Sequence, residues 1–542
     1  MNPPLKLTRA PIFIFIGMVV MGVRASNLDT IGVTALRAAT TNVNGAGIYV
    51  AQPEASLTTD LLTWEVNPTN ENYVLNQPTS LFAYYSSSGS TNSYPNTLGT
   101  DSWHADYVAL NFYGLPGGVA TNVAHVDNYE ADYFYNSIIA VTLPANINDP
   151  VVNQSFIFTE TNGGQSTVSD QQSIDSAYDN YAAEYSTLFC SGAGNGSPLY
   201  VNPPATCYNG IGVGVSDAGT NSSVGPTIDN GRCKPDIIAP GGATSFSTPY
   251  ISGAAAVLMQ AGLRGDGGSD TNSAVDMRTV KALLLNGAIK PADWTNNAPS
   301  PLDYRYGAGV LNVFNSYEQL SGGEHPFIIS TSVTSGDPHP PTGNSGTISA
   351  LSGWDFNTIS SGAGFFLNPA QDGVNHYYFD VTNGSNNAAF TATITLVWNR
   401  QQNQTNINNL SLFLYDVLSS NLVAASTSVV DNVQHIFVPQ LPQGRYDLQV
   451  LKSAANSVSD PETYALAFEF FSLALSISPS GTDTALSWSV YPAGFVVEAR
   501  TNLTSPSVWS TNNIPSPVLT NNQNYILLNA TNANEFFRLR RP

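Results

Sequence analysis

The length, composition and charge of this 542-residue chain exclude several classes of protein. At roughly 100 to 200 residues per domain, it has room for two to four compact units, so it is no small disulfide-dependent scaffold. Its 18 Lys and Arg against 39 Asp and Glu give a net charge of −21, and no run of basic residues follows a phosphate backbone, which argues against nucleic acid as a partner. A hydrophobic content of 42% can fill cores, which argues against disorder throughout the chain.

The N-terminus has the pattern of a secretory signal. Lys6 and Arg9 precede an uncharged, largely apolar stretch over residues 10–23, which is too short to span a bilayer core of about 30 Å comfortably. Small residues near position 25 predict cleavage before Ser26. We therefore expect a signal peptide over residues 1–25 and a secreted or extracytoplasmic protein; an uncleaved membrane anchor is the alternative.

Residues 26–323 have the alternation of strands and helices that is typical of an α/β domain. Short apolar runs that read as strands occur at 48–51, 123–126, 186–190 and 211–215. Two helices are expected among the intervening segments, one beginning near Ser245 and one over residues 275–285, with Ser273 and Asp276 spaced as in a capping box. This order predicts a parallel sheet with helices on both faces.

The pattern changes after Gly322 and Gly323, where Pro and Gly become frequent and helical periodicity ends. Residues 324–472 contain β-rich segments separated by Asn, Gly and Ser, which predicts an all-β, jelly-roll-like sandwich. Residues 473–542 predict a further small β module. If these units are accessory, a cut after Gly323 leaves a folded domain. Three tryptophans, Trp398, Trp488 and Trp509, are expected in β cores more often than as stacking platforms.

Three cysteines occur, Cys190, Cys207 and Cys233. An odd number in an exported chain allows one disulfide and one free thiol, and the preferred pair is Cys207 with Cys233 because Cys190 falls in an expected buried strand. Three free thiols are the alternative. The spacings do not fit a zinc site.

The segment over residues 234–255, KPDIIAPGGATSFSTPYISGAA, carries the most chemical information. Its glycines and prolines predict a sharp turn, and Ser245 then stands at the start of a helix. The amides and macrodipole of a helix N-terminus stabilise a developing oxyanion. Taken alone, Ser245 would be an ordinary N-cap residue.

This segment resembles the nucleophile region of subtilisin-like serine peptidases, the subtilase family, which has Pro-Asp, Ala-Pro-Gly and Gly-Thr-Ser-x-Ala-x-Pro. Ala243 replaces the glycine before Thr, and Ser247 replaces the alanine. The resemblance covers residues 40 to 320. It implies a subtilisin-like α/β fold and a serine endopeptidase that cleaves polypeptides through an acyl-enzyme on Ser245.

A nucleophilic serine needs a base, and histidine suits this role near neutral pH. The part of the α/β region before Ser245 has two histidines, His104 and His125. His104 lies in WHADYVA, which resembles the segment of the family that carries the catalytic histidine, with its Gly and Thr changed. His125 stands in an apolar run and is expected to be a strand histidine. We assign the base to His104.

The resemblance also assigns the two remaining roles. Asn195, in CSGAGNG, resembles the asparagine that donates to the tetrahedral oxyanion. The run GAGIYVAQPE places Glu54 where the family has the aspartate that orients the histidine, and Asp60 is a less favoured substitute. We expect a Glu54 carboxylate oxygen within about 3.2 Å of one ring nitrogen of His104, with the Ser245 hydroxyl near the other.

The sequence leaves two other functions open. The changes around Glu54 and His104 fit a catalytically degenerate domain in an exported binding or surface protein. An acid-active peptidase with a Ser-Glu-Asp arrangement is the third possibility, against which His104 argues. No cofactor is expected; structural calcium is common in the family, but no Asp-rich loop identifies a metal site. For the C-terminal modules, three roles stay open: binding of polysaccharide or other cell-surface material, binding of protein, and retention of the enzyme at a surface.

Overall fold

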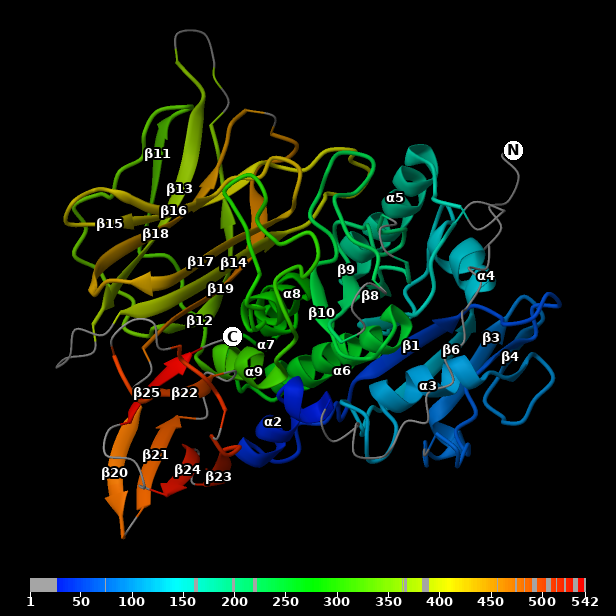
Figure 1. The fold of residues 1–542 in the computed structure, drawn as a ribbon. Helices are drawn as coiled ribbons and strands as arrows, with labels where there is room; N and C mark the ends of the chain where they lie inside the picture. The colour runs from blue at the N-terminus through cyan, green and yellow to red at the C-terminus, as the bar shows by residue number, and fades with distance from the viewer. Residues whose placement is uncertain are drawn as a thin grey trace.

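The computed structural model shows an α/β part, a β-sandwich and a small C-terminal β part, arranged as in Figure 1. The expected signal peptide, residues 1–25, lies outside the described residues. No helix within the described ranges is long and apolar enough to cross a membrane. The structure describes residues 27–73, 75–159, 164–196, 200–217, 222–362, 364, 368–382, 389–455, 457–472, 475–481, 483–489, 495–503, 508–512, 514–520, 523–529 and 535–540.

The α/β part is built on an eight-stranded sheet with the order β10-β9-β8-β7-β1-β6-β3-β4. All neighbouring pairs are parallel except β3 with β4. Its strands are β1 (Tyr49–Glu54), β3 (Phe82–Ser86), β4 (Gly89–Thr91), β6 (His125–Glu130), β7 (Val151–Gln154), β8 (Leu188–Gly192), β9 (Ile211–Val215) and β10 (Ile237–Ala239). A separate pair is formed by β2 (Thr63–Glu65) and β5 (Thr100–Asp101).

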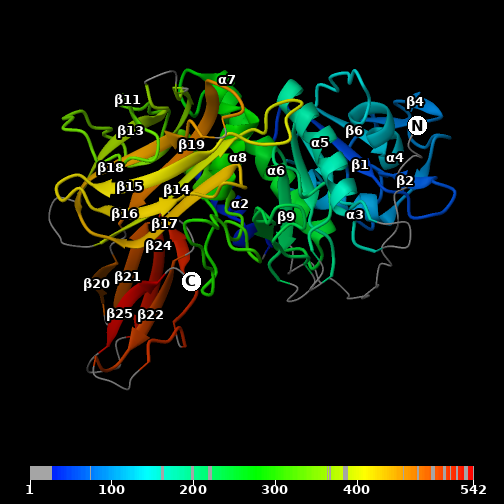
Figure 2. The ribbon, with the colours of Figure 1, turned by 90° about the horizontal axis from the view of Figure 1, so that it is seen from above.

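Helices cover both faces of this sheet, as expected (Figure 2). Successive residues of a strand point to opposite faces. On β8, Phe189 contacts the rings of Tyr178 and Tyr181 in α5, whereas the neighbouring Cys190 faces the α6 side. The helices are α2 (Val33–Ala39), η1 (Thr79–Leu81), α3 (Trp103–Phe112), α4 (Ala131–Tyr133), η2 (Phe134–Ile139), α5 (Val168–Tyr185), α6 (Thr244–Leu263), α7 (Thr271–Ala274), α8 (Met277–Asn286) and α9 (Val313–Ser321).

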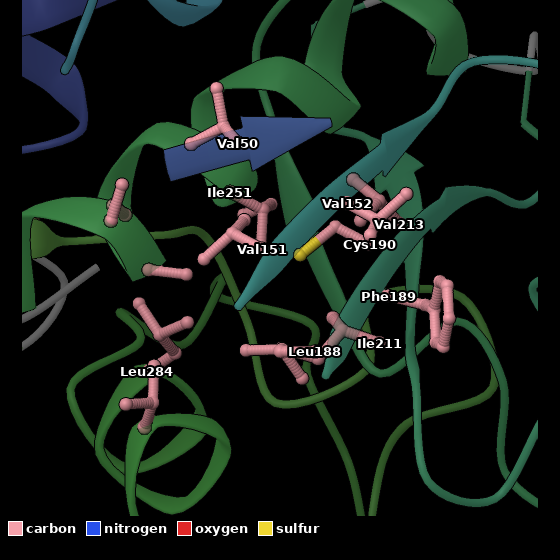
Figure 3. Close-up of a cluster of buried hydrophobic side chains, with 14 of the residues drawn as sticks. Val50, Val151, Val152, Leu188, Phe189, Cys190, Ile211, Val213, Ile251 and Leu284 are labelled. Carbon is pink, nitrogen blue, oxygen red and sulfur yellow. The ribbon is translucent and has the colours of Figure 1, made fainter. Parts of the chain in front are cut away.

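The core of the α/β part lies between the sheet and α6. Figure 3 shows Val151, Leu188 and Cys190 of neighbouring strands together with Ile251 of α6 and Leu284 of α8. Strands β8 and β9 are buried along their whole length, as is usual for parallel strands covered on both faces. The core therefore fixes the position of α6 relative to the carboxyl ends of the strands.

Helix α8 begins two residues later than predicted, and α6 contains a glycine whose role the structure explains. Helix α8 begins at Met277 because Asp276 is its N-cap, with a side chain that accepts from the amide of Arg278; Ser273 belongs to the preceding α7. In α6, a Cβ atom at Gly253 would lie 2.6 Å from Cβ of Val119. Glycine at this position therefore permits the close approach of α6 to the segment that follows α3.

The sandwich consists of two antiparallel sheets, as predicted, with strand orders β11-β13-β18-β15-β16 and β12-β19-β14-β17. The strands are β11 (Ile329–Thr334), β12 (Ser352–Ile359), β13 (Gln371–Val381), β14 (Phe390–Trp398), β15 (Leu410–Asp416), β16 (Leu422–Ser426), β17 (Val433–Leu441), β18 (Gly444–Lys452) and β19 (Glu462–Phe471).

The sandwich shares a hydrophobic core with the α/β part. Helices α8 and α9 pack on the sheet that contains β12, β14 and β19. On this outer face, Trp354, Val397 and Ala467 belong to the same buried cluster as the core of the α/β part. Buried polar groups reinforce the contact: Asn286 Oδ1 accepts from the hydroxyls of Thr393 and Thr395 at 3.1 and 3.0 Å. The two parts are thus tightly joined.

The small C-terminal part has its own core, which contains Leu486, Trp488 and Ile526. Trp398 and Trp488 are buried, as expected, so neither offers a stacking platform. Trp509 lies against the guanidinium groups of two arginines. Polysaccharide binding by these modules stays a prediction. The strands are β20 (Ser476–Ser480), β21 (Asp483–Ser489), β22 (Val496–Arg500), β23 (Val518–Thr520), β24 (Gln523–Asn529) and β25 (Phe536–Arg540).

The preferred disulfide between Cys207 and Cys233 is not formed: both residues and Cys190 are buried free thiols. The Cys207 thiol instead contacts Oδ1 of Asp175 at 3.5 Å. Burial raises the pKa of Cys190 to about 12, which keeps this thiol protonated. The alternative of three free thiols is the one that the structure contains.

Candidate active site

The expected site residues come from the carboxyl ends of neighbouring strands. Glu54 is the last residue of β1, Ser155 directly follows β7, and Asn195 follows β8. The turn after β10 leads into α6, which begins at Thr244. Because the carboxyl ends of parallel strands meet at one edge of the sheet, this edge brings together side chains that are far apart in the sequence.

The turn before α6 accommodates Ala243, which stands where the subtilase pattern has glycine. Ala243 has φ −151° and ψ 153°, an extended conformation that any residue adopts, so glycine is not needed there. Gly242 has φ 73°, which favours glycine. The amides of Gly241 and Gly242 donate to Oδ1 of Asp217 at 3.0 and 2.9 Å. The turn is thereby fixed, and Ser245 lies in the first turn of α6.

Ser245 and Ser155 exchange two hydrogen bonds. The Ser245 hydroxyl donates to the Ser155 carbonyl at 3.3 Å, and the Ser155 hydroxyl donates to the Ser245 carbonyl at 2.8 Å. Across the described ranges, Ser245 has no hydrogen bond to His104. This differs from the expected placement of the Ser245 hydroxyl against the ring, because the backbone carbonyl of Ser155 competes for the same proton.

His104 stands in the first turn of α3, where Ser102 caps the helix by accepting from the amide of Ala105. Its Nδ1 lies 3.0 Å from Oε2 of Glu54, within the distance expected from the sequence. The side chains are 10% and 1% exposed, so little water competes for the contact. A carboxylate only accepts hydrogen bonds; Nδ1 therefore carries the hydrogen, and Nε2 of a neutral His104 is left as the acceptor.

The other candidates for base and orienting group lie elsewhere. His125 begins β6, and its Nε2 pairs with Oδ1 of Asp127 at 3.0 Å. Asp60 lies in an exposed loop, where its carboxylate accepts from the hydroxyl of Thr58 and the amide of Leu62. Glu54 is thus the carboxylate that contacts His104.

Asn195 is tied to the start of α6. Its Oδ1 accepts from the backbone amide and the hydroxyl of Thr244, at 2.8 and 3.0 Å. A backbone amide can only donate, so the side-chain atom that the Thr244 amide contacts is the oxygen of Asn195. The nitrogen Nδ2 is therefore the other atom of this side-chain amide. This nitrogen has no hydrogen-bond partner within the described ranges.

Two buried acidic residues lie at the start of α3 or in β2, which contacts this helix. Burial raises the pKa of Asp106 to about 8, although the amide of Asn67 donates to it at 2.6 Å. Burial likewise raises the pKa of Glu65 to about 7, with a smaller contribution from the charge of Asp101. Neither carboxyl group was predicted as a site residue. A polar residue within an otherwise apolar helix or strand pattern is the signal that would have drawn attention to them.

Gln52, a buried polar residue of β1, was also not predicted as a site residue. Its Nε2 donates to Oε1 of Glu54 at 2.9 Å. Residues two apart on a strand point to the same face, so the strand periodicity relates Gln52 to Glu54. Within the described part of the chain, no group of three or more His, Cys, Asp or Glu side chains is arranged to hold a metal ion.

Comparisons with known proteins match this chain to one family model and to several solved structures. The model of the subtilase family, Peptidase_S8, matches residues 109–309. Among solved structures, the prenylagaramide maturation protease PagA is 20% identical with a TM-score of 0.36, and the alignment covers 53% of this chain and 98% of that chain. The self-cleaved protease domain of PatA is 21% identical, with coverage of 52% and 99% and a TM-score of 0.36.

Tripeptidyl peptidase 2 is 15% identical with a TM-score of 0.31, over 74% of this chain and 43% of that chain. No curated protein sequence matches this chain. The segment matched by the family model contains Asn195 and Ser245, whereas Glu54 and His104 precede it. The likeness to the subtilase family therefore rests on residues 109–309.

Proposed function

We propose that the protein is a secreted serine endopeptidase that hydrolyses peptide bonds in polypeptide substrates. The observation that carries this proposal is the buried 3.0 Å contact between Nδ1 of His104 and Oε2 of Glu54. The ring of His104 also packs 5.6 Å from the ring of Phe246, the residue after Ser245. A histidine oriented by a carboxylate thus lies beside the first turn of α6.

In this mechanism the Ser245 hydroxyl leaves the Ser155 carbonyl and donates to Nε2 of His104. Oγ attacks the scissile carbonyl while His104 takes the proton, and Glu54 stabilises the imidazolium that forms. The oxyanion accepts from Nδ2 of Asn195 and from the backbone N–H of Ser245, one of the amides left without an intrahelical partner at a helix start. The leaving amine takes the proton from His104, and water then hydrolyses the acyl-enzyme.

A second candidate function is supported by the hydrogen bond from Ser245 to the Ser155 carbonyl. If this bond persists, Ser245 is not activated, and the domain is a degenerate peptidase that serves as a binding or surface protein. The two functions differ in whether Ser245 reacts with a carbonyl substrate at all.

Single substitutions test the proposal in a peptidase assay with a set of fluorogenic peptides. Ser245→Ala and His104→Ala should each abolish cleavage without changing the thermal unfolding midpoint greatly, because the two groups act as a unit. His125→Ala is the matched control, since His125 pairs with Asp127 rather than with Glu54, and it should retain activity. Full activity of His104→Ala would move the base elsewhere, and a wild-type protein inert toward every peptide would favour the binding function.

A further inference from the structure

Glutamate in place of aspartate at position 54 raises a problem of positioning. The longer side chain has one more rotatable bond, so it loses more conformational freedom when a single orientation is required. A carboxylate held through one oxygen can still turn about its terminal bond. The Oε2 atom of Glu54 contacts His104, and the second oxygen therefore needs a partner of its own if the orientation is to be fixed.

Gln52 supplies that partner. Its Nε2 donates to Oε1 of Glu54 at 2.9 Å and to the carbonyl of Ala105 at 3.0 Å. The first bond holds the carboxylate, and the second holds the first turn of α3, the helix that carries His104. One amide group therefore fixes the two members of the Glu54–His104 pair relative to each other.

Gln52 is itself held by Tyr113. The Tyr113 hydroxyl donates to Oε1 of Gln52 at 2.6 Å, and both side chains are fully buried. The amide can be placed in only one orientation here, since Glu54 and the Ala105 carbonyl accept while the phenol donates. Burial raises the pKa of Tyr113 well above its usual value, so the phenol stays a neutral donor.

We propose that Gln52 and Tyr113 form a positioning relay that holds the longer Glu54 side chain where it orients His104. These are positioning residues rather than catalytic residues, because they reach the reaction only through Glu54. The inference rests on the proposed function for its kinetic consequences, but the arrangement itself is a property of the folded protein and is measurable without any substrate.

The kinetic test compares Gln52→Leu and Tyr113→Phe with a matched control. Gln52→Leu should lower kcat roughly 10- to 100-fold with KM unchanged, the size of loss that follows when a group that orients a metal ligand is removed. Tyr113→Phe should lower kcat roughly tenfold, because it leaves Oε1 of Gln52 buried without its donor. The control is Tyr178→Phe, since the Tyr178 hydroxyl also bonds a buried glutamine, Gln154, and should leave kcat unchanged.

A double-mutant cycle separates positioning from general destabilisation. In a Glu54→Gln background, Gln52→Leu should cause almost no further loss of kcat, because the group through which it acts is already gone. An equal loss in both backgrounds would overturn the relay. If Gln52→Leu does not fold, Tyr113→Phe, which removes one oxygen atom, is used in the same cycle.

Proton NMR tests the relay independently of activity. The wild-type protein should show a low-field resonance for Nδ1–H of His104 that disappears in His104→Ala and shifts or broadens in Tyr113→Phe, but not in Tyr178→Phe. A resonance that is unchanged in Tyr113→Phe, together with unchanged kcat, would contradict the proposal. An inert wild-type protein with the expected resonance changes would instead refute the peptidase function and leave the relay intact.

Discussion

At the scale of single residues, the proposed mechanism depends most on Glu54, which contacts the proposed base His104. Its Oε2 accepts from Nδ1 of His104, which selects the tautomer with Nε2 free to accept a proton. Glu54→Gln should lower kcat roughly 10⁴-fold, because an amide donor facing Nδ1 favours the wrong tautomer. Steady-state kinetics and circular dichroism measure the loss and check the fold. A loss smaller than tenfold would show that Glu54 does not orient the base.

The substitution Glu54→Asp has a different expected outcome. It retains the charge but withdraws the carboxylate by one methylene from both His104 and Gln52, whose contacts are 3.0 and 2.9 Å. We expect kcat between the values of the wild type and Glu54→Gln, measured in the same assay. Activity at or above that of the wild type would show that the backbone position suits aspartate and that the extra methylene has no role.

Asn195 offers a test of the proposed oxyanion site. Since its Oδ1 is held by Thr244, Asn195→Ala removes a donor whose orientation is fixed in advance. The substitution should lower kcat roughly 10²- to 10³-fold with little change in KM. Asn195→Asp is a useful companion, because it retains the acceptor for Thr244 and removes the donor. A change confined to KM in either variant would assign Asn195 to substrate binding or to the turn.

At the scale of elements, the sequence pattern predicted the main strands and helices but not the hydrogen bonds between them. The apolar runs identified β1, β6, β8 and β9, and the segment from Ser245 identified α6, because periodicity and turn chemistry act locally. Hydrogen bonds between distant segments could not be predicted in this way. The bond from Ser245 to Ser155 and the contacts of Gln52 depend on how β1, β7, α3 and α6 pack together.

The buried acids near α3 make stability depend on pH. The pKa of Asp106 is about 8 in the folded protein and near 4 in an unfolded chain. Between these values the folded state binds the proton and the unfolded state does not, so this residue lowers stability as pH rises, by up to about 1.4 kcal/mol per pH unit. Asp106→Asn should therefore flatten the fall in melting temperature between pH 5 and pH 8. An unchanged slope would contradict this assignment.

At the scale of the whole molecule, the boundary after Gly323 marks a change of architecture without separating two independent units. The sandwich lies against α8 and α9 in Figure 1, and Gln319 of α9 donates to Glu469 of β19 at 3.1 Å. The sequence could show where helical periodicity ends. The sequence could not show the contact between the helices and the sandwich. Apolar residues on the outer faces of α8, α9 and the sandwich sheet have the same pattern as residues in the core of a single domain.

A cut after Gly323 should therefore give an insoluble or strongly destabilised protein, contrary to the expectation from the sequence. It exposes the shared apolar surface and leaves buried groups such as Asn286 without Thr393 and Thr395. A cut after residue 472 is the matched control and should leave a folded protein, because the small module has its own core. Solubility and thermal unfolding distinguish the two. A stable, active product of the cut after Gly323 would show that the shared core is dispensable.

The central claim, that Ser245 is a nucleophile activated by the Glu54–His104 pair, is tested most directly by covalent labelling. A fluorophosphonate probe should label the wild-type protein, with mass spectrometry placing the adduct on Ser245, and should label His104→Ala and Glu54→Gln far more slowly. His125→Ala should react at the wild-type rate. Absence of labelling in folded wild-type protein, or an equal rate in His104→Ala, would contradict the account.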